Sequence, residues 1–273
     1  MNAESINSYY GQPDLSANIL AALERAGKDL NALTREDFAP FEEFHVRGRA
    51  ATMDLANAAG LHEGMVVLDV GSGIGGPART LAAEFGCKVT GLDLTDEYCR
   101  AAEMLTGRVG LSDKVTFRQG NALDMPFDDG AFDLVWMQHM TMNIEDKERL
   151  FGQIRRVLRA GGRLALHEIL AGSVAPVHFP VPWANDSAIS FLVAPPEVRR
   201  LLASTRFEEL MWTDVTGESI DLLRKLGAAA QGAPAPLGLH LLVGDFAEKF
   251  ANVLRNMEED RIALVQGVFE RGK

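Results

Sequence analysis

The stretch Val67-Leu68-Asp69-Val70-Gly71-Ser72-Gly73-Ile74-Gly75-Gly76 decides the fold of this chain. The apolar run that begins at Met65 is almost continuous and stops at the first glycine, which predicts a strand buried on both faces, as in parallel sheets. Residues 78–85 then predict a helix. A strand that passes through close-set glycines into a helix lets a ligand approach bare backbone at the carboxyl end of the strand. The alternative is a tight turn with a purely structural role.

The same alternation of strand and helix continues along the chain. The clearest helix begins near Glu145 and ends near Arg159, with acidic residues at its start, arginines at its end and one apolar face. Alternating strands and helices imply right-handed crossovers and a parallel sheet with helices on both faces. Further strands are predicted at 88–94, 115–117, 132–137, 163–170, 207–216 and 262–270.

Composition limits the function classes that remain. The 273 residues are 47% hydrophobic and 24% charged, as in soluble globular proteins. The net charge of −11 argues against binding to nucleic acid or to an anionic membrane. Cys87 and Cys99 are the only cysteines, so neither a disulfide framework nor a metal site is expected. No signal peptide or membrane-spanning run is evident, and we expect a cytoplasmic protein.

Two kinds of ligand fit the glycine turn. Gly71, Gly73 and Gly76 match G-x-G-x-x-G, the dinucleotide fingerprint of an NAD(P)-dependent oxidoreductase. With Gly75 in place of Gly76 the pattern is G-x-G-x-G, preceded by Asp69. The Asp69 carboxylate would repel a pyrophosphate but would attract a ligand that carries ammonium and sulfonium groups. This acid therefore favours the second kind of ligand.

The stretch from Val67 to Gly76 resembles the first motif of class I S-adenosylmethionine-dependent methyltransferases. Gly91-Leu92-Asp93-Leu94 resembles the second motif, whose acid binds both ribose hydroxyls. The run from Arg118 to Phe127 resembles the third motif, which meets the adenine, with Asn121 where aspartate is usual. The fourth and fifth strands also match, and the resemblance extends over about residues 60–170.

Two further segments narrow the resemblance. Residues 136–147 and 44–49 are similar to the sarcosine/dimethylglycine N-methyltransferase-like group and its quinone and tocopherol methyltransferase relatives. This likeness implies methylation of a small molecule, with N- or O-methylation favoured and C- or S-methylation of a quinone-like metabolite as the alternative. It does not identify the acceptor or the oligomeric state. Methylation of RNA or protein, and binding of the cofactor without turnover, are further alternatives.

The resemblance also implies an α/β fold, namely a Rossmann-like, doubly wound sheet of seven strands that is mostly parallel with one antiparallel strand. We expect one domain over 1–273, with an N-terminal helical lid, a cofactor-binding core, two insertions that cap the substrate site, and two edge strands. Within the lid, residues 1–14 are expected to be a mobile arm. The lid is 1–60, the core 61–170, the insertions 171–206 and 217–260, with a loop at 227–238, and the edge strands 207–216 and 262–270.

Site residues follow from the same resemblance. The cofactor is S-adenosyl-L-methionine, and S-adenosyl-L-homocysteine is its product. We expect the amino-acid end to lie on the glycine turn, the ribose on Asp93, and the adenine on Asn121 with Ala122. Arg47 is a candidate partner of the cofactor carboxylate, or else a surface arginine. The expected cofactor-binding residues are Asp69, Gly71, Ser72, Gly73, Asp93, Leu94, Asn121, Ala122, Gln138 and Arg47.

Candidates for the chemistry lie after the fourth and fifth strands. His139 is the first choice for a base or for a group that orients the acceptor, and the alternative is a histidine that only shapes the pocket. Neighbouring strand residues face opposite ways, so either His167 or Glu168 points into the site, and we favour Glu168. A carboxylate held by a nearby helix N-terminus is the alternative for Glu168.

Three residues are expected to contact the acceptor. His45 precedes the core and can close over the cofactor. His178 and Trp183 lie in the first insertion, which in such folds supplies substrate specificity. The alternative for Trp183 is that it packs the insertion onto the body.

Overall fold

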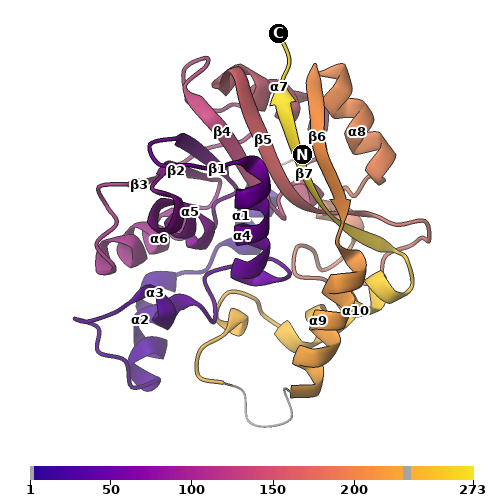
Figure 1. Cartoon of the computed structure of the whole chain (residues 1–273). Coiled ribbons are helices and arrows are strands. Elements are labelled where there is room, and N and C mark those ends of the chain that lie inside the picture. Colours follow the sequence, from indigo (N-terminus) through magenta and orange to yellow (C-terminus); the bar gives the residue numbers. More distant parts are fainter. Residues whose placement is uncertain (1–2, 230–234) are drawn as a thin grey trace.

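A seven-stranded sheet forms the centre of the molecule. The structure is a computed structural model, and it describes residues 3–229 and 235–273. The strand order is β3-β2-β1-β4-β5-β7-β6, and the strands fan across the view in Figure 1. The strands are β1 (Val66–Val70), β2 (Lys88–Asp93), β3 (Val115–Gln119), β4 (Phe132–Gln138), β5 (Leu158–Ala171), β6 (Phe207–Asp214) and β7 (Ile262–Arg271).

The strand directions confirm the predicted sheet. β1 pairs in parallel with β2 and β4, and the parallel set continues outward to β3 and β5. β7 is antiparallel to both of its neighbours, β5 and β6. The order reverses between β1 and β4, and in open α/β sheets a ligand crevice forms at such a switch point.

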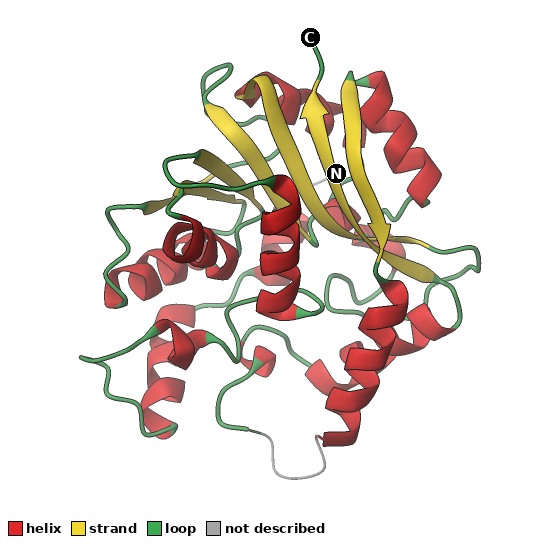
Figure 2. Cartoon of the chain, in the orientation of Figure 1, coloured by secondary structure: helices red, strands yellow, loops and turns green. Residues whose placement is uncertain are grey.

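Helices cover both faces of the sheet and its lower edge, as Figure 2 shows in red. The α-helices are α1 (Ala3–Tyr10), α2 (Leu15–Arg25), α3 (Arg35–Phe38), α4 (Gly48–Ala59), α5 (Gly76–Phe85), α6 (Asp96–Arg108), α7 (Lys147–Val157), α8 (Pro195–Ser204), α9 (Thr216–Ala229) and α10 (Phe246–Glu258). Short 3₁₀ turns are η1 (Thr141–Asn143), η2 (Ser187–Ile189) and η3 (Leu239–Leu241).

Alternate residues of the strands feed two separate apolar cores. Leu68 packs in one core with residues of α7 and α8, whereas Val67 packs in the other with residues of α4 and α5. This alternation follows from the strand period of two. In Figure 1, α2, α3, α9 and α10 lie below the sheet, on the side where the parallel strands end. They therefore surround the edge at which a ligand is expected.

Three local predictions differ from the structure. The mobile arm predicted at 1–14 is wrong over most of its length, because α1 occupies Ala3–Tyr10. The clearest helix, α7, ends at Val157 instead of Arg159, since Leu158 is extended and pairs with Phe132. In the loop predicted at 227–238, residues 227–229 belong to α9 instead, and residues 230–234 lie outside the described residues.

A buried ion pair connects the start of α5 with residues 39–47, the stretch between α3 and α4 that is called the N-terminal segment below. Arg79 donates to Glu42 at 3.0 and 3.2 Å, and both side chains are fully buried. Arg79 also donates to the carbonyl of Ile74 in the glycine turn at 2.9 Å. Gly76 lies so close to this segment that a Cβ there would come within 2.1 Å of the Glu42 carbonyl oxygen. The fold therefore requires a residue without a side chain at this contact.

Replacing Gly76 with alanine tests the contact. We expect Gly76→Ala to lower the free energy of unfolding by about 1–3 kcal/mol, because the segment must shift to admit the methyl group. Urea denaturation measures the change. Gly107→Ala in α6 is the matched control, since its Cβ would meet only the Ser112 hydroxyl, at 3.7 Å. The control is expected to be neutral or to stabilise by up to about 1 kcal/mol, and equal losses in both variants would contradict the analysis.

Candidate functional site

A cavity lies at the carboxyl ends of β1, β2 and β4, and it brings most of the predicted site residues together. Its wall includes residues from α1, the N-terminal segment before α4, the glycine turn, the loop at 181–183 and α10. The predicted residues that line it are His45, Asp69, Gly71, Ser72, Gly73, Asp93, Leu94, Asn121, Ala122, Gln138, His139 and Trp183. The predicted residues that do not line it are Arg47, Glu168 and His178.

Asp69 is a buried acid with an uncompensated oxygen. Its side chain comes from the end of β1, and within the described residues its Oδ2 has no hydrogen-bond partner. Burial raises the pKa of Asp69 from 3.8 to about 8, and the nearby carboxylates of Glu43 and Asp93 add to the shift. The carboxyl group is therefore in a place where a cationic ligand would favour its ionised form.

Asp93 ties the glycine turn to the end of β2. One carboxylate oxygen accepts from the backbone N–H of Gly73 at 2.8 Å, and the other accepts from that of Thr95 at 2.9 Å. Burial raises the pKa of Asp93, although these N–H groups oppose the shift. Gly73 has a φ of 53°, and a Cβ there would meet no atom within 4 Å. The turn thus presents bare backbone to an open part of the cavity.

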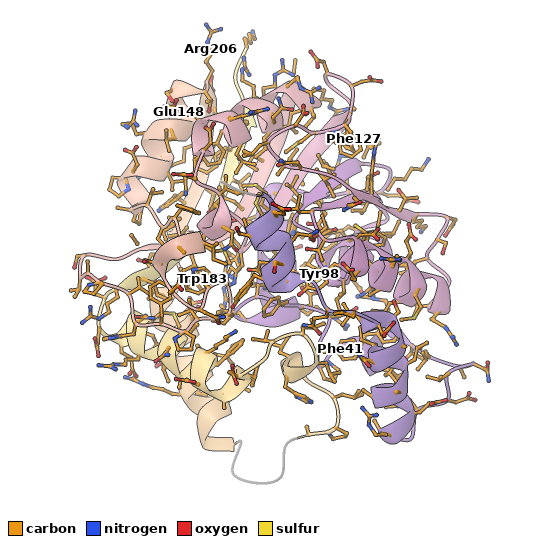
Figure 3. All side chains as sticks on the ribbon, turned by 180° about the vertical axis from the view of Figure 1, so that it is seen from behind. Phe41, Tyr98, Phe127, Glu148, Trp183 and Arg206 are labelled. Carbon is orange, nitrogen blue, oxygen red and sulfur yellow. The ribbon has the colours of Figure 1, made fainter. Side chains whose placement is uncertain are left out.

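Several residues that line this cavity carry a buried polar atom without a partner among the described residues. Eight buried side-chain atoms have no hydrogen-bond partner within the part of the chain that the structure describes. Five of them belong to residues that line the cavity: Asp69, Ser72, Tyr98, Gln138 and His139. Figure 3 shows Tyr98 and Trp183 on either side of a helix near the centre of the molecule. Because buried polar groups normally find partners, this cluster indicates a site for a polar ligand.

The amide of Gln138 shows how the fold orients one of these groups. Its Oε1 accepts from the indole of Trp136 at 2.9 Å, and it lies 3.3 Å from the Thr52 hydroxyl, which donates its proton to Glu43 at 2.6 Å. This arrangement leaves Nε2 as a donor without a partner among the described residues. A ligand acceptor atom in the cavity would satisfy it.

His139 lies in a left-handed turn, with a φ of 50°, directly after β4. Its ring stacks on His167 with 4.9 Å between centroids, and the His45 ring lies 5.9 Å away. Burial, together with these two histidines, holds the pKa of His139 well below its usual range. The imidazole is therefore neutral near pH 7, and its Nε2 is unpartnered within the described residues. A neutral ring can orient an acceptor or take a proton from it.

Glu168 does not line the cavity, but it contacts the turn that carries His139. The carboxylate accepts from the backbone N–H groups of Met140 and Thr141, at 3.1 and 3.0 Å, and from Thr141 Oγ1 at 2.8 Å. Burial raises the pKa of Glu168 to about 7, against the effect of these bonds. The neighbouring His167 faces the other side of the strand and bonds to the Val46 carbonyl at 3.1 Å. Glu168 thus holds the residues that follow His139.

Two other predicted residues are engaged elsewhere. Arg47 pairs with Asp54 at 2.7 Å and with Glu218 at 3.3 Å. His178 bonds to Glu259 at 2.8 Å. Asn121 does line the cavity, but its Oδ1 already accepts from the Leu123 N–H at 2.9 Å. The second lone pair of that oxygen and the amide Nδ2 remain available to a ligand.

Several lining residues escaped the sequence analysis as site residues. Tyr10 donates to Asn143 Oδ1 at 2.8 Å, and both residues line the cavity. Phe250 and Val253 of α10 line it as well. The adjacent aromatic residues Tyr9 and Tyr10, at the end of α1, were a signal in the sequence that could have identified Tyr10. No pattern around α10 distinguishes these two apolar residues from ordinary core positions.

Two searches limited to residues 3–229 and 235–273 found nothing. No group of three or more His, Cys, Asp or Glu side chains there is placed to hold a metal ion. No described helix combines the length and the apolar character that crossing a membrane would require.

Comparisons with known proteins agree with this geometry. The family model for a methyltransferase domain matches residues 68–166. A sterol 24-C-methyltransferase of Gibberella zeae is 41% identical over 116 residues, 42% of this chain, and the match spans 30% of that relative's length. The sarcosine/dimethylglycine N-methyltransferase of Halorhodospira halochloris is 29% identical over 78% of this chain and 75% of its own.

A solved structure supports the fold. The geranyl diphosphate C-methyltransferase of Streptomyces coelicolor A3(2), determined with Mg²⁺, geranyl diphosphate and S-adenosyl-L-homocysteine, superposes with a TM-score of 0.67. The sequence identity is 22%, and the superposition covers 82% of this chain and 77% of that one. This neighbour shares the Rossmann-like architecture.

The raised pKa of Asp69 predicts that replacing this residue makes the fold more stable. The folded-state pKa of about 8 lies above the ordinary 3.8, so the unfolded chain binds fewer protons and stability falls as pH rises between these values. Asp69→Asn removes that loss, and we expect its melting temperature at pH 7 to rise by at least about 3 °C. Thermal unfolding from pH 5 to 8 measures this. Exposed Asp113→Asn is the control, and a lower melting temperature for Asp69→Asn alone would contradict the prediction.

Proposed function

We propose that this chain, which carries a methyltransferase domain, transfers a methyl group from S-adenosylmethionine to a small-molecule acceptor. The observation that carries the proposal is the cluster of unpartnered polar atoms in the cavity at the glycine turn. When bound, the cofactor supplies an electrophilic methyl group on a sulfonium. The chain's part is to bind, align and exclude water, which accounts for much of the rate in such displacements.

The polar atoms match the parts of this cofactor. Asp69, with a free oxygen, suits the ammonium group. Asp93 holds the turn and keeps lone pairs for the ribose hydroxyls. Asn121 and Ala122 would face the adenine. Asp69 disfavours the alternative, an NAD(P)-dependent oxidoreductase, because a pyrophosphate on this turn would meet its buried carboxyl group and no cationic side chain among the described lining residues.

The acceptor chemistry that the site favours is N- or O-methylation. His139 lines the cavity, its Nε2 has no partner among the described residues, and its neutral ring can orient the hydroxyl or amine of the acceptor by a hydrogen bond. C- or S-methylation of a quinone-like molecule is the alternative. Glu168 accepts hydrogen bonds from the backbone N–H groups of Met140 and Thr141, and in this way it would hold the turn that carries His139.

Two wider proposals accompany this function. Residues 1–60 act as a lid and the insertions as a cap, since α1, the 181–183 loop and α10 all contribute to the cavity wall. A reducing cytoplasmic compartment suits Cys87 and Cys99, both of which are free thiols.

Calorimetry tests the cofactor. We expect S-adenosylhomocysteine to bind and NADH not to bind. Because the pKa of Asp69 is raised to about 8, a cationic partner must displace its proton, so binding at pH 7 should release up to one proton. Titrations in buffers of different ionisation enthalpy measure this release. Asp69→Asn should abolish the proton release and weaken binding by about tenfold or more, whereas Asp113→Asn should change neither. NADH binding without S-adenosylhomocysteine binding would overturn the proposal.

Replacing His139 tests the mechanism. Asparagine is the suitable substitute, because it tolerates the left-handed turn. We expect His139→Asn to lower kcat by about a hundredfold or more while S-adenosylhomocysteine affinity stays within about twofold. Exposed His62→Asn is the control. Full turnover by His139→Asn with any acceptor found in a metabolite screen would exclude His139 as a base or an orienting group.

A further inference from the structure

We propose that the acceptor is a largely apolar molecule that carries no anionic group. This inference rests on the proposed function, since it concerns the part of the same cavity that the cofactor would leave to the acceptor. It separates this chain from relatives named for a carboxylate or a diphosphate substrate.

The first argument is the wall that lies away from the glycine turn. This wall comes from α1, η1, the end of β5, the 181–183 loop and α10, and most of its side chains are apolar. Trp183 and Val253 are almost fully buried, and Phe250 is half-buried. The wall residues are Ile6, Met142, Ile169, Trp183, Phe250 and Val253.

The second argument is charge. Among the described residues that line the cavity, none is a lysine or an arginine, while Glu42, Asp69 and Asp93 are acids. The described lining residues offer an anionic group no cationic side chain, so such a group would lose its hydration without gaining a partner from the protein, which costs several kcal/mol.

Nearby cations are committed to other partners. Arg47 pairs with Asp54 and Glu218 outside the cavity. The Lys147 ammonium donates to the carbonyls of Ile144 and Phe191, at 2.7 and 2.5 Å. The Lys249 ammonium lies 3.0 Å from the Tyr9 hydroxyl and packs over that ring. Turning any of them into the cavity would break an existing interaction.

The third argument is that the polar side chains of this wall bond to one another. Asn143 accepts from Tyr10 and donates to the carbonyls of Trp183 and Ile189, at 2.9 and 2.8 Å. The Trp183 indole donates to Ser190 Oγ at 3.0 Å. These groups fix the wall and leave few polar atoms for a ligand. The unpartnered His139 Nε2 and Gln138 Nε2 then meet the acceptor's hydroxyl or amine.

A matched pair of fluorescent probes tests the inference. N-phenyl-1-naphthylamine and 8-anilino-1-naphthalenesulfonate share one ring skeleton, and only the second carries a sulfonate. With the protein saturated by S-adenosylhomocysteine, we expect the neutral probe to bind at least about tenfold more tightly than the anionic one. Equal affinities, tighter binding of the sulfonate, or no binding of the neutral probe would overturn the inference.

Two variants test whether the probes bind in this cavity. Phe250→Arg introduces a cation into the wall and should narrow the preference to about threefold or less, or reverse it. Ala251→Arg, at the next residue of α10 but exposed and outside the lining, should keep the preference of the natural chain. An unchanged preference in Phe250→Arg contradicts the inference. Failure of S-adenosylhomocysteine to bind contradicts the proposed function instead, so the two failures are distinguishable.

Discussion

The buried pair of Arg79 and Glu42 is the interaction on which the site depends. The Arg79 guanidinium lies in the first turns of α5 and reaches both the N-terminal segment and the glycine turn, through Glu42 and the Ile74 carbonyl. Breaking such a pair leaves a buried charge without a partner, at a cost of about 3–5 kcal/mol. The segment that carries His45 and the turn that carries Gly73 are therefore held together, and both line the cavity.

The acids around this pair are neutralised in different ways. Glu42 has two arginines, Arg79 and Arg49, within 3.0 Å. Burial raises the pKa of Glu43, but hydrogen bonds from His45, Thr52 and Thr80 outweigh it and bring the value below the usual one. Asp69 has no comparable compensation within the described residues, and its pKa is raised. The acidic character of the chain, with a net charge of −11, therefore has one consequence at the site. Burial of the Asp69 carboxyl group lowers the stability of the fold, and it favours the binding of a cation there.

The sequence predicts the parts of the fold that depend on local pattern. The local sequence is enough to predict the strand, the glycine turn and the helix from Val67 onward, and it also predicts that Asp93 lies at the end of a strand. The predicted end of helix α7 lies two residues too late, at Arg159 instead of Val157, because Leu158 continues the apolar helical face and is equally well buried in a strand. Periodicity cannot separate two conformations that bury the same side chain.

Contacts between distant segments account for what the sequence did not predict. Helix α1 is short and polar, and its packing depends on partners such as Val181 for Tyr9 and Asn143 for Tyr10, which lie 172 and 133 residues away. Isolated helices of this length are marginal in water, so only tertiary contacts keep it. The role of Glu168 has a similar origin, because the backbone N–H groups that it accepts from belong to a turn whose shape the strand pattern does not specify.

The two walls of the cavity differ in how their polar atoms are used. On the wall at the glycine turn, Asp69, Ser72 and Tyr98 keep atoms without partners among the described residues, so a ligand there must supply complementary polar groups. On the opposite wall, Asn143 and the Trp183 indole are satisfied by the protein itself. A ligand on that wall gains little from polar groups and is selected by shape and apolar area. A molecule with one reactive polar group and an apolar body would therefore suit the proposed acceptor site, where His139 also lines the cavity.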